Sequence, residues 1–202
     1  MAEPKMPQGM IDWMNDRQWG WHHLEWHVVR QWDFLGTSGQ QWATDQGWSR
    51  ASRQEGETGN GLEFLVMHRA MIELLKRDFP TEVHLLQGWY RVPTDPDDIN
   101  DPVPVDIVPR GFRPTMLTAV NSLEMDAFLS SFTNDDAFGL YIETSRRPGG
   151  FSVDDTTGIH NYLHGRFSAP ADPVNMGDPE VNLGNARFWR LHGWIDNRWT
   201  AF

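Results

Sequence analysis

Six of the eight histidines in this 202-residue chain follow a pattern that could hold metal ions. Two pairs have their members four residues apart, and two single histidines each come four residues after a phenylalanine. The pairs are His23 with His27 and His160 with His164, and the single residues are His68 and His192. Residues i and i+4 lie on one face of a helix, with Cβ atoms about 5–6 Å apart, so each pair could chelate one ion.

The order along the chain is pair, single, pair, single, which predicts two sites of three imidazoles each. Ligation by imidazole alone favours copper or zinc over magnesium, calcium or manganese. The paired Glu-x-x-His motifs of carboxylate-bridged di-iron proteins do not occur. Because the chain has no cysteine, thiolate metal sites, disulfides and thiol nucleophiles are excluded. His22 and His84 lie outside the pattern and are expected at the surface or in a supporting role.

Taken singly, these histidines have an ordinary alternative. A lone histidine on an apolar helix face, such as His68 or His192, also fits a hydrogen-bonded core residue. A lone His-x-x-x-His pair is a weak signal as well. The repetition of one arrangement twice favours metal binding.

The segments that carry the histidines have helical patterns. The Trp19, His23, Trp26 and His27 spacing predicts a helix from Asp12 to about Leu35. The strongest signal covers 62–79 and ends at Pro80. Further helices are expected at 117–132, 157–167 and 186–200, with a loose tail at 1–10 and loops at 36–61, after 132 and from 168 to about 184.

Residues 93–114 are crowded with proline and aspartate and cannot form a regular helix. So long a connection is expected to wrap over the core or cover a site. The fold prediction is therefore a single, mainly α domain over 1–202. It would be a four-helix bundle that houses a dinuclear metal site, with long irregular loops rich in Pro, Gly and Asp.

Composition narrows the function further. The formal net charge of −11 disfavours nucleic acid and anionic lipid as partners. No stretch has the roughly 20 apolar residues of a membrane span, and the N-terminus does not read as a secretory signal. The lack of cysteine fits a reducing compartment, so we expect a cytoplasmic location. The eleven tryptophans are expected to be mostly structural, with several forming a dry shell beside the histidines.

Residues 158–199 resemble the second copper-binding region of the tyrosinase family of type 3 copper proteins. The resemblance rests on HNYLH at 160–164, MGD at 176–178 and ARFWRLHGWIDNRW at 186–199. It implies copper ligands at His160, His164 and His192. FLVMHRAMIEL at 64–74 is similar to that family's first copper region, which implies a ligand at His68.

The first region departs from the tyrosinase pattern. Most tyrosinases have a ligand histidine about nine residues before the one matched by His68, but Thr58, Gly59 and Asn60 stand there. His23 and His27 offer the replacement, in an arrangement similar to the first copper site of arthropod hemocyanins. Otherwise the first site lacks a ligand, and His27 is the one expected to be kept.

The resemblance implies an enzyme with two copper ions that activates O₂ and oxidises a small phenol, catechol or aminophenol, within a biosynthetic pathway in one interpretation. Hydroxylation of a monophenol is linked in the family to the residue matched by Asn161 and to an upstream glutamate. Phe151 occupies that upstream position, nine residues before His160, and Asp154 or Asp155 could substitute. Since the chain ends three residues after Trp199, no C-terminal shielding domain is expected, which leaves room for a copper-loading or shielding partner protein.

Two charged residues are expected to support the ligands. Arg69 directly follows His68, and Asp196 lies one turn after His192. If their helices are adjacent, the two could form a buried ion pair that locks the helices together; the alternative is two unrelated surface charges.

Other functions remain open at this point. One is an O₂- or copper-binding protein without turnover. Another is a degenerate relative of the family that serves as a scaffold with only the second site filled. A third is a zinc hydrolase with histidine ligands.

Overall fold

The computed structural model describes residues 5–144 and 158–202, and over these ranges the protein is mainly helical, as predicted. The α-helices are α1 Gln8–Asp16, α2 Trp19–Arg30, α3 Gly36–Asp45, α4 Asn60–Asp78, α5 Pro114–Ser122, α6 Asp126–Leu129, α7 Asp135–Thr144, α8 Ile159–Arg166 and α9 Ala186–Ala201. Short 3₁₀ turns occur at Trp32–Phe34, Val83–Leu85 and Asn182–Gly184. In place of strands, the described ranges contain an isolated antiparallel bridge between Lys5 and Asn185.

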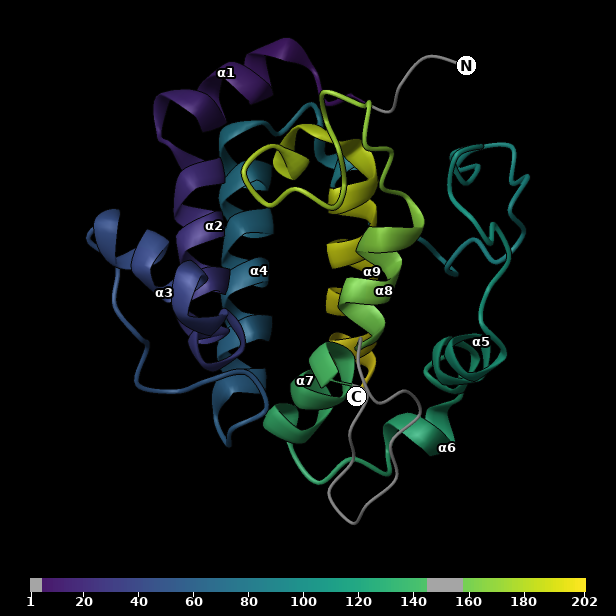
Figure 1. The fold of residues 1–202 in the computed structure, drawn as a ribbon. Helices are drawn as coiled ribbons and strands as arrows, with labels where there is room; N and C mark the ends of the chain where they lie inside the picture. The colour runs from purple at the N-terminus through teal and green to yellow at the C-terminus, as the bar shows by residue number, and fades with distance from the viewer. Residues whose placement is uncertain (1–4, 145–157) are drawn as a thin grey trace.

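Figure 1 shows α2 and α4 on one side of the view and α8 and α9 on the other, with α1 across the top and α7 at the bottom. The long helix α4 packs against α7 and α9, and α7 also packs against α8. The buried core follows these contacts and is rich in aromatic side chains. None of the described helices is long and apolar enough to cross a membrane.

The helices that carry the histidines begin and end close to the predicted residues. The expected segments 62–79, 157–167 and 186–200 are confirmed as α4, α8 and α9. Gly59, at φ 93°, adopts the left-handed conformation just before α4, and α4 stops before Pro80. The Asn185 side chain caps α9 by accepting a hydrogen bond from the Arg187 N–H.

The N-terminal prediction is wrong in two respects. The single helix expected at 12–35 is two helices, because the chain turns at Gln18, which has a left-handed φ of 54°. The described part of the expected loose tail is also ordered. Met6 and Met10 are buried, and the Met6 N–H donates to the Gly184 carbonyl over 2.9 Å. Burial of methionines four residues apart outweighs the proline and glycine signals around them.

Three predicted segments differ for packing reasons. The expected loop at 36–61 contains α3, which is anchored by the fully buried Ala43. The expected helix at 117–132 is interrupted, giving α5 and α6. Helix α7 lies where a loop was expected after 132. It packs so tightly on α4 that a Cβ on Gly139 would lie 2.1 Å from the Gly61 carbonyl oxygen.

Residues 93–113 are irregular, as predicted, and α5 begins at Pro114. One buried carboxylate ties this excursion to the core. Asp101 accepts a hydrogen bond from the Trp89 indole at 2.9 Å and one from Arg190 at 2.7 Å, and Arg187 lies 3.4 Å from it. The excursion is therefore held against α9.

Candidate metal centre

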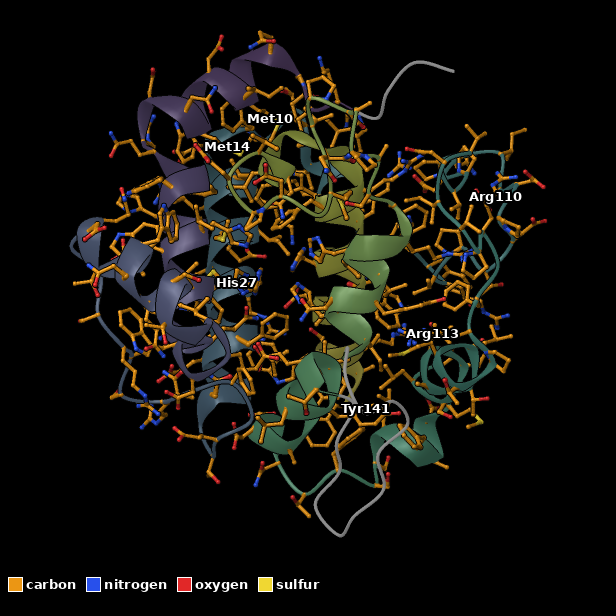
Figure 2. All side chains as sticks on the ribbon, in the orientation of Figure 1. Met10, Met14, His27, Arg110, Arg113 and Tyr141 are labelled. Carbon is orange, nitrogen blue, oxygen red and sulfur yellow. The ribbon has the colours of Figure 1, made fainter. Side chains whose placement is uncertain are left out.

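The structure brings all six predicted ligand histidines together, from α2, α4, α8 and α9. The ring centroids of His27, on α2, and His160, on α8, lie 5.8 Å apart. Those of His68 and His192 lie 4.1 Å apart, which joins α4 to α9. His27 lies on the face of α2 that is turned toward α8 and α9 (Figure 2).

Four of these imidazoles are oriented by backbone carbonyls. The Nδ1 atoms of His68 and His192 donate to the Phe64 and Phe188 carbonyls at 2.9 and 2.8 Å, and those of His23 and His164 donate to the Pro179 and Met176 carbonyls at 3.0 and 2.6 Å. A carbonyl oxygen can only accept, so in each neutral ring the proton is on Nδ1. The Nε2 atom of each ring therefore carries a lone pair that can bind a metal.

The phenylalanine before each single histidine has a structural reason. In both α4 and α9 its carbonyl fixes the histidine one turn later, and its ring packs on the imidazole. The centroid distances are 4.5 Å for Phe64 with His68 and 4.0 Å for Phe188 with His192. The repeated sequence pattern thus corresponds to a repeated local geometry.

The Nε2 atoms converge. They lie 3.1 Å apart between His23 and His27, and also 3.1 Å apart between His160 and His192. Two nitrogen ligands of one ion with bonds of about 2.0–2.1 Å lie about 3 Å apart, so the donors suit a metal. The Nε2 atoms of His68 and His164 are buried and have no hydrogen-bond partner. A buried polar atom without a partner is unusual, and a bound cation would satisfy both.

The grouping of the histidines differs in part from the predicted one. His23, His27 and His68 form one compact group, with ligand atoms all within 4.8 Å of one another, as the sequence pattern predicts. A second such group joins His160 and His192 to His68 rather than to His164. The His164 ring nevertheless lies near both of the others, with centroids 4.5 Å from His160 and 5.4 Å from His192. His68 therefore lies between the two halves of the cluster.

Burial keeps the six imidazoles neutral. Desolvation is the largest cause for each of them, and it lowers the pKa of His23 and of His164 to about 4. It lowers the pKa of the other four well below 6.5, and neighbouring imidazoles lower it further. Neutral imidazole is the form that binds metal ions, so the cluster is ready to bind them at neutral pH.

The same burial predicts acid sensitivity. Below pH 6.5 the unfolded chain takes up protons on these histidines and the folded chain does not, so the free energy of unfolding should fall as the pH drops from 6.5 toward about 4. Glu143 has the opposite effect on stability. Burial raises its pKa, so the stability that its protonated form contributes is lost as the pH rises above 4.5. This single carboxyl group is outnumbered by the six histidines. Urea unfolding of the metal-free protein across this window measures the effect. His164→Gln should lose less stability than the wild type, and a midpoint independent of pH would contradict the account.

An open cavity of about 390 Å³ leads to the cluster. It is lined by His23, His27, Gln31, His160, Asn161, His164, Gly165, Met176, Gly177, Pro179 and Asn182. No Asp, Glu, Lys or Arg of the described chain lines it, while Gln31, Asn161 and Asn182 offer amide groups. The exposed Asn161 thus lies at the mouth, beside His160. The structure does not describe the position of the family's upstream glutamate, which is Phe151 here. Its two possible substitutes, Asp154 and Asp155, also lie outside the described residues.

Arg69 and Asp196 do form an ion pair, which joins α4 to α9. The pair is only partly buried, with side-chain exposures of 35% and 18%, so the expectation of a buried pair is wrong. Arg69 also donates to the Thr200 hydroxyl at 3.0 Å and lies 3.5 Å above the Trp199 ring. The longer arginine side chain reaches water along the apolar ring, as such side chains commonly do.

Asp196→Ala should lower the free energy of unfolding by about 1 kcal/mol, because the pair is partly solvated. For a chain of this size, that corresponds to a fall of about 2–4 °C in melting temperature. If the cluster binds copper as predicted from the sequence, the affinity should fall as well, since α4 and α9 carry His68 and His192. Thermal unfolding and metal analysis test this, with the exposed Asp45→Ala as a control. Unchanged melting temperature and metal content would contradict the role assigned to the pair.

Sequence reasoning did not identify several residues that shape this centre. The carbonyls of Pro179 and Met176, which orient His23 and His164, lie in a loop with no helical signal. Gly88 and Gly193 pack backbone to backbone, with a Cβ on Gly193 only 2.5 Å from the Gly88 nitrogen. The MGD run at 176–178 was the one available signal for the loop. Neither glycine stands out in the sequence.

Four of the eleven tryptophans are buried, Trp48, Trp89, Trp189 and Trp194, and most of the others are partly buried. Trp189 and Trp194 are fully buried, and their indole N–H groups donate to the Leu183 carbonyl at 2.8 Å and to the Glu124 carboxylate at 2.9 Å. The Trp26 ring lies 4.9 Å from the His27 ring and 6.0 Å from the His68 ring. His22 and His84 are both exposed, outside the six-histidine cluster.

In comparisons with known proteins, no family model, no curated protein and no solved structure matches this chain. Any assignment of function therefore rests on the site itself and on the resemblance of the motifs at 64–74 and 158–199.

Proposed function

We propose that this protein is a type 3 dicopper oxidase, a tyrosinase-like enzyme that uses O₂ to oxidise phenols, catechols or aminophenols. The observation that carries the proposal is the convergence of six neutral imidazoles from four helices, in which the Nε2 atoms of each of two histidine pairs, His23 with His27 and His160 with His192, lie 3.1 Å apart. In the proposed arrangement, α2, α4, α8 and α9 act as a four-helix bundle around two metal ions.

His23, His27 and His68 would hold the first ion, and His160, His164 and His192 the second. The unpartnered Nε2 of His164 favours its use as the third ligand of the second ion, in spite of the compact grouping of His68 with His160 and His192. The two sets would then be equivalent, each with one pair from a single helix and one histidine after a phenylalanine.

Bound copper would supply O₂ activation and accept electrons from the aromatic substrate. The chain itself orients the ligand imidazoles and excludes water from the site. Backbone carbonyls hold the proton on Nδ1 of four ligands, so no proton has to leave Nε2 before a metal binds. Buried aromatic rings such as Phe64 and Phe188 keep water from the inner side of the cluster.

The open cavity favours an enzyme over an oxygen carrier, because a carrier needs no access for an aromatic ring. Its uncharged lining suits a neutral ring. Amide groups of Gln31 and Asn161 could hydrogen-bond a phenolic hydroxyl at the mouth, and the buried Asn182 lines the cavity as well. If Asn161 also helps to deprotonate a monophenol, Asn161→Ala would reduce hydroxylation of monophenols more than oxidation of catechols.

Oxygen uptake by the copper-loaded protein with a catechol and with a para-substituted monophenol tests the proposal. We expect uptake with the catechol, and its loss in His160→Ala. A copper-loaded protein that binds O₂ reversibly but does not consume it with either compound would support a carrier instead. Hydrolytic activity that requires zinc would support the zinc enzyme.

A further inference from the structure

A second cavity, of about 240 Å³, opens beside His23, which belongs to the first histidine group (His23, His27 and His68). It is lined by Trp19, His22, His23, Trp26, Met67 and Met71. His23 lines this cavity and also the one at the mouth of the cluster. The side chain of His23 therefore borders both cavities.

The donors in this second cavity are soft. Met67 and Met71 lie one turn apart on the same face of α4, and both are half-buried. The His22 side chain is 63% exposed, and its Nδ1 lies 4.0 Å from the Glu25 carboxylate. Thioethers select monovalent copper over harder divalent ions, and imidazole is compatible with it. The side chains of Trp19 and Trp26 complete the lining, and the Trp26 ring already has the Arg30 guanidinium 4.3 Å from its centroid.

Two of these three donors are next in sequence to a histidine of the group formed by His23, His27 and His68. Met67 precedes His68 on α4, and His22 precedes His23 on α2. Five of the six imidazoles are buried, with His68 only 4% exposed, and His27 is half-buried. An ion that reaches the cluster from this cavity must pass His23, so the donors lie where an incoming ion would first be held.

We infer that Met67, Met71 and His22 form an entry site for Cu(I), from which copper passes to His23, His27 and His68. This inference rests on the proposed copper function. The transfer is an exchange of ligands: one imidazole Nε2 replaces one thioether at a time, copper stays monovalent, and no electron moves. No proton is released at His23 or His68, because their Nδ1–H groups are already held by carbonyls.

The experiment combines loading kinetics with direct detection of the methionines. In Met67→Leu/Met71→Leu, leucine keeps a similar apolar volume but removes both sulfur atoms. We expect copper from a Cu(I)–chelator complex to enter about tenfold more slowly than in the wild type. The final content of two copper ions per chain should be unchanged. Met125→Leu, at an exposed methionine far from both cavities in sequence, serves as the matched control.

Binding itself is read from the ¹³C-labelled methyl groups of the nine methionines, with Ag(I) as a diamagnetic substitute for Cu(I). In His23→Ala/His27→Ala, which lacks two ligands of the first site, the first equivalent of Ag(I) should fill the intact second site. The second equivalent should then shift the Met67 and Met71 signals and leave the other methionines unchanged. Unchanged signals, or equal loading rates in the double methionine variant, would overturn the entry site while leaving the proposed function intact. Shifted signals in a protein that never binds copper at its histidines would overturn the proposed function and the transfer step together.

Discussion

His68→Ala should abolish oxidase activity and reduce copper from two ions to no more than one per chain. Its Nε2 is buried without a partner and belongs to both compact groups of histidine nitrogens. Because the proposed chemistry needs both ions at once, loss of one is enough to lose turnover. Oxygen uptake with a catechol and metal analysis of the same sample measure the two effects. His84→Ala, at an exposed histidine outside the cluster, should keep both ions and full activity.

A matched variant, His164→Ala, decides which histidine completes the second site. If His164 is the third ligand of that site, this variant should also keep no more than one copper ion. If His68 fills both roles, His164→Ala would keep two ions and His68→Ala would keep none. That second pattern would contradict the assignment of three separate ligands to each ion. Circular dichroism of each variant shows whether the helices remain folded.

Gly193→Ala should destabilise the protein strongly and weaken copper binding. A Cβ there would lie 2.5 Å from the Gly88 nitrogen, 2.7 Å from its Cα and 3.0 Å from the Leu86 carbonyl oxygen. These are backbone atoms that cannot rotate away, so α9 must shift, and His192 shifts with it. Overpacking of this kind costs about 1–3 kcal/mol.

Gly165→Ala is the control, since it is also a helical glycine but has no atom within 4 Å of its added Cβ. Alanine in a helix should there be neutral or stabilise by about 0.5–1 kcal/mol. Thermal unfolding of the metal-free proteins separates the two variants. Equal melting temperatures would contradict the close approach of α9 to the 86–89 segment.

Prediction from the sequence was most successful where one short pattern indicates both a helix and the histidine that the helix carries. The spacing of Phe64 with His68, and of Phe188 with His192, predicted helices and inward-facing histidines, and the structure has both. The i, i+4 pairs placed His23 beside His27 and His160 beside His164 for the same reason.

The parts that could not be predicted depend on contacts between distant segments. Nothing local to Gln18 indicates that its left-handed conformation divides the first helix. Helix α7 packs on α4 through the close approach of Gly139 to Gly61. This contact exists only when both helices are in place, so the local sequence does not indicate it. The position of His68 between the two histidine pairs is likewise a property of the assembled helices, so sequence spacing alone assigned it to one side.

Metal content of the purified, copper-loaded protein, followed by an absorption spectrum as O₂ is added to the reduced form, tests the central claim most directly. The account predicts two copper ions per chain and a new charge-transfer band that appears with O₂ and is absent from His68→Ala. A single bound ion per chain, or zinc retained in place of copper with no change on adding O₂, would contradict a dicopper centre.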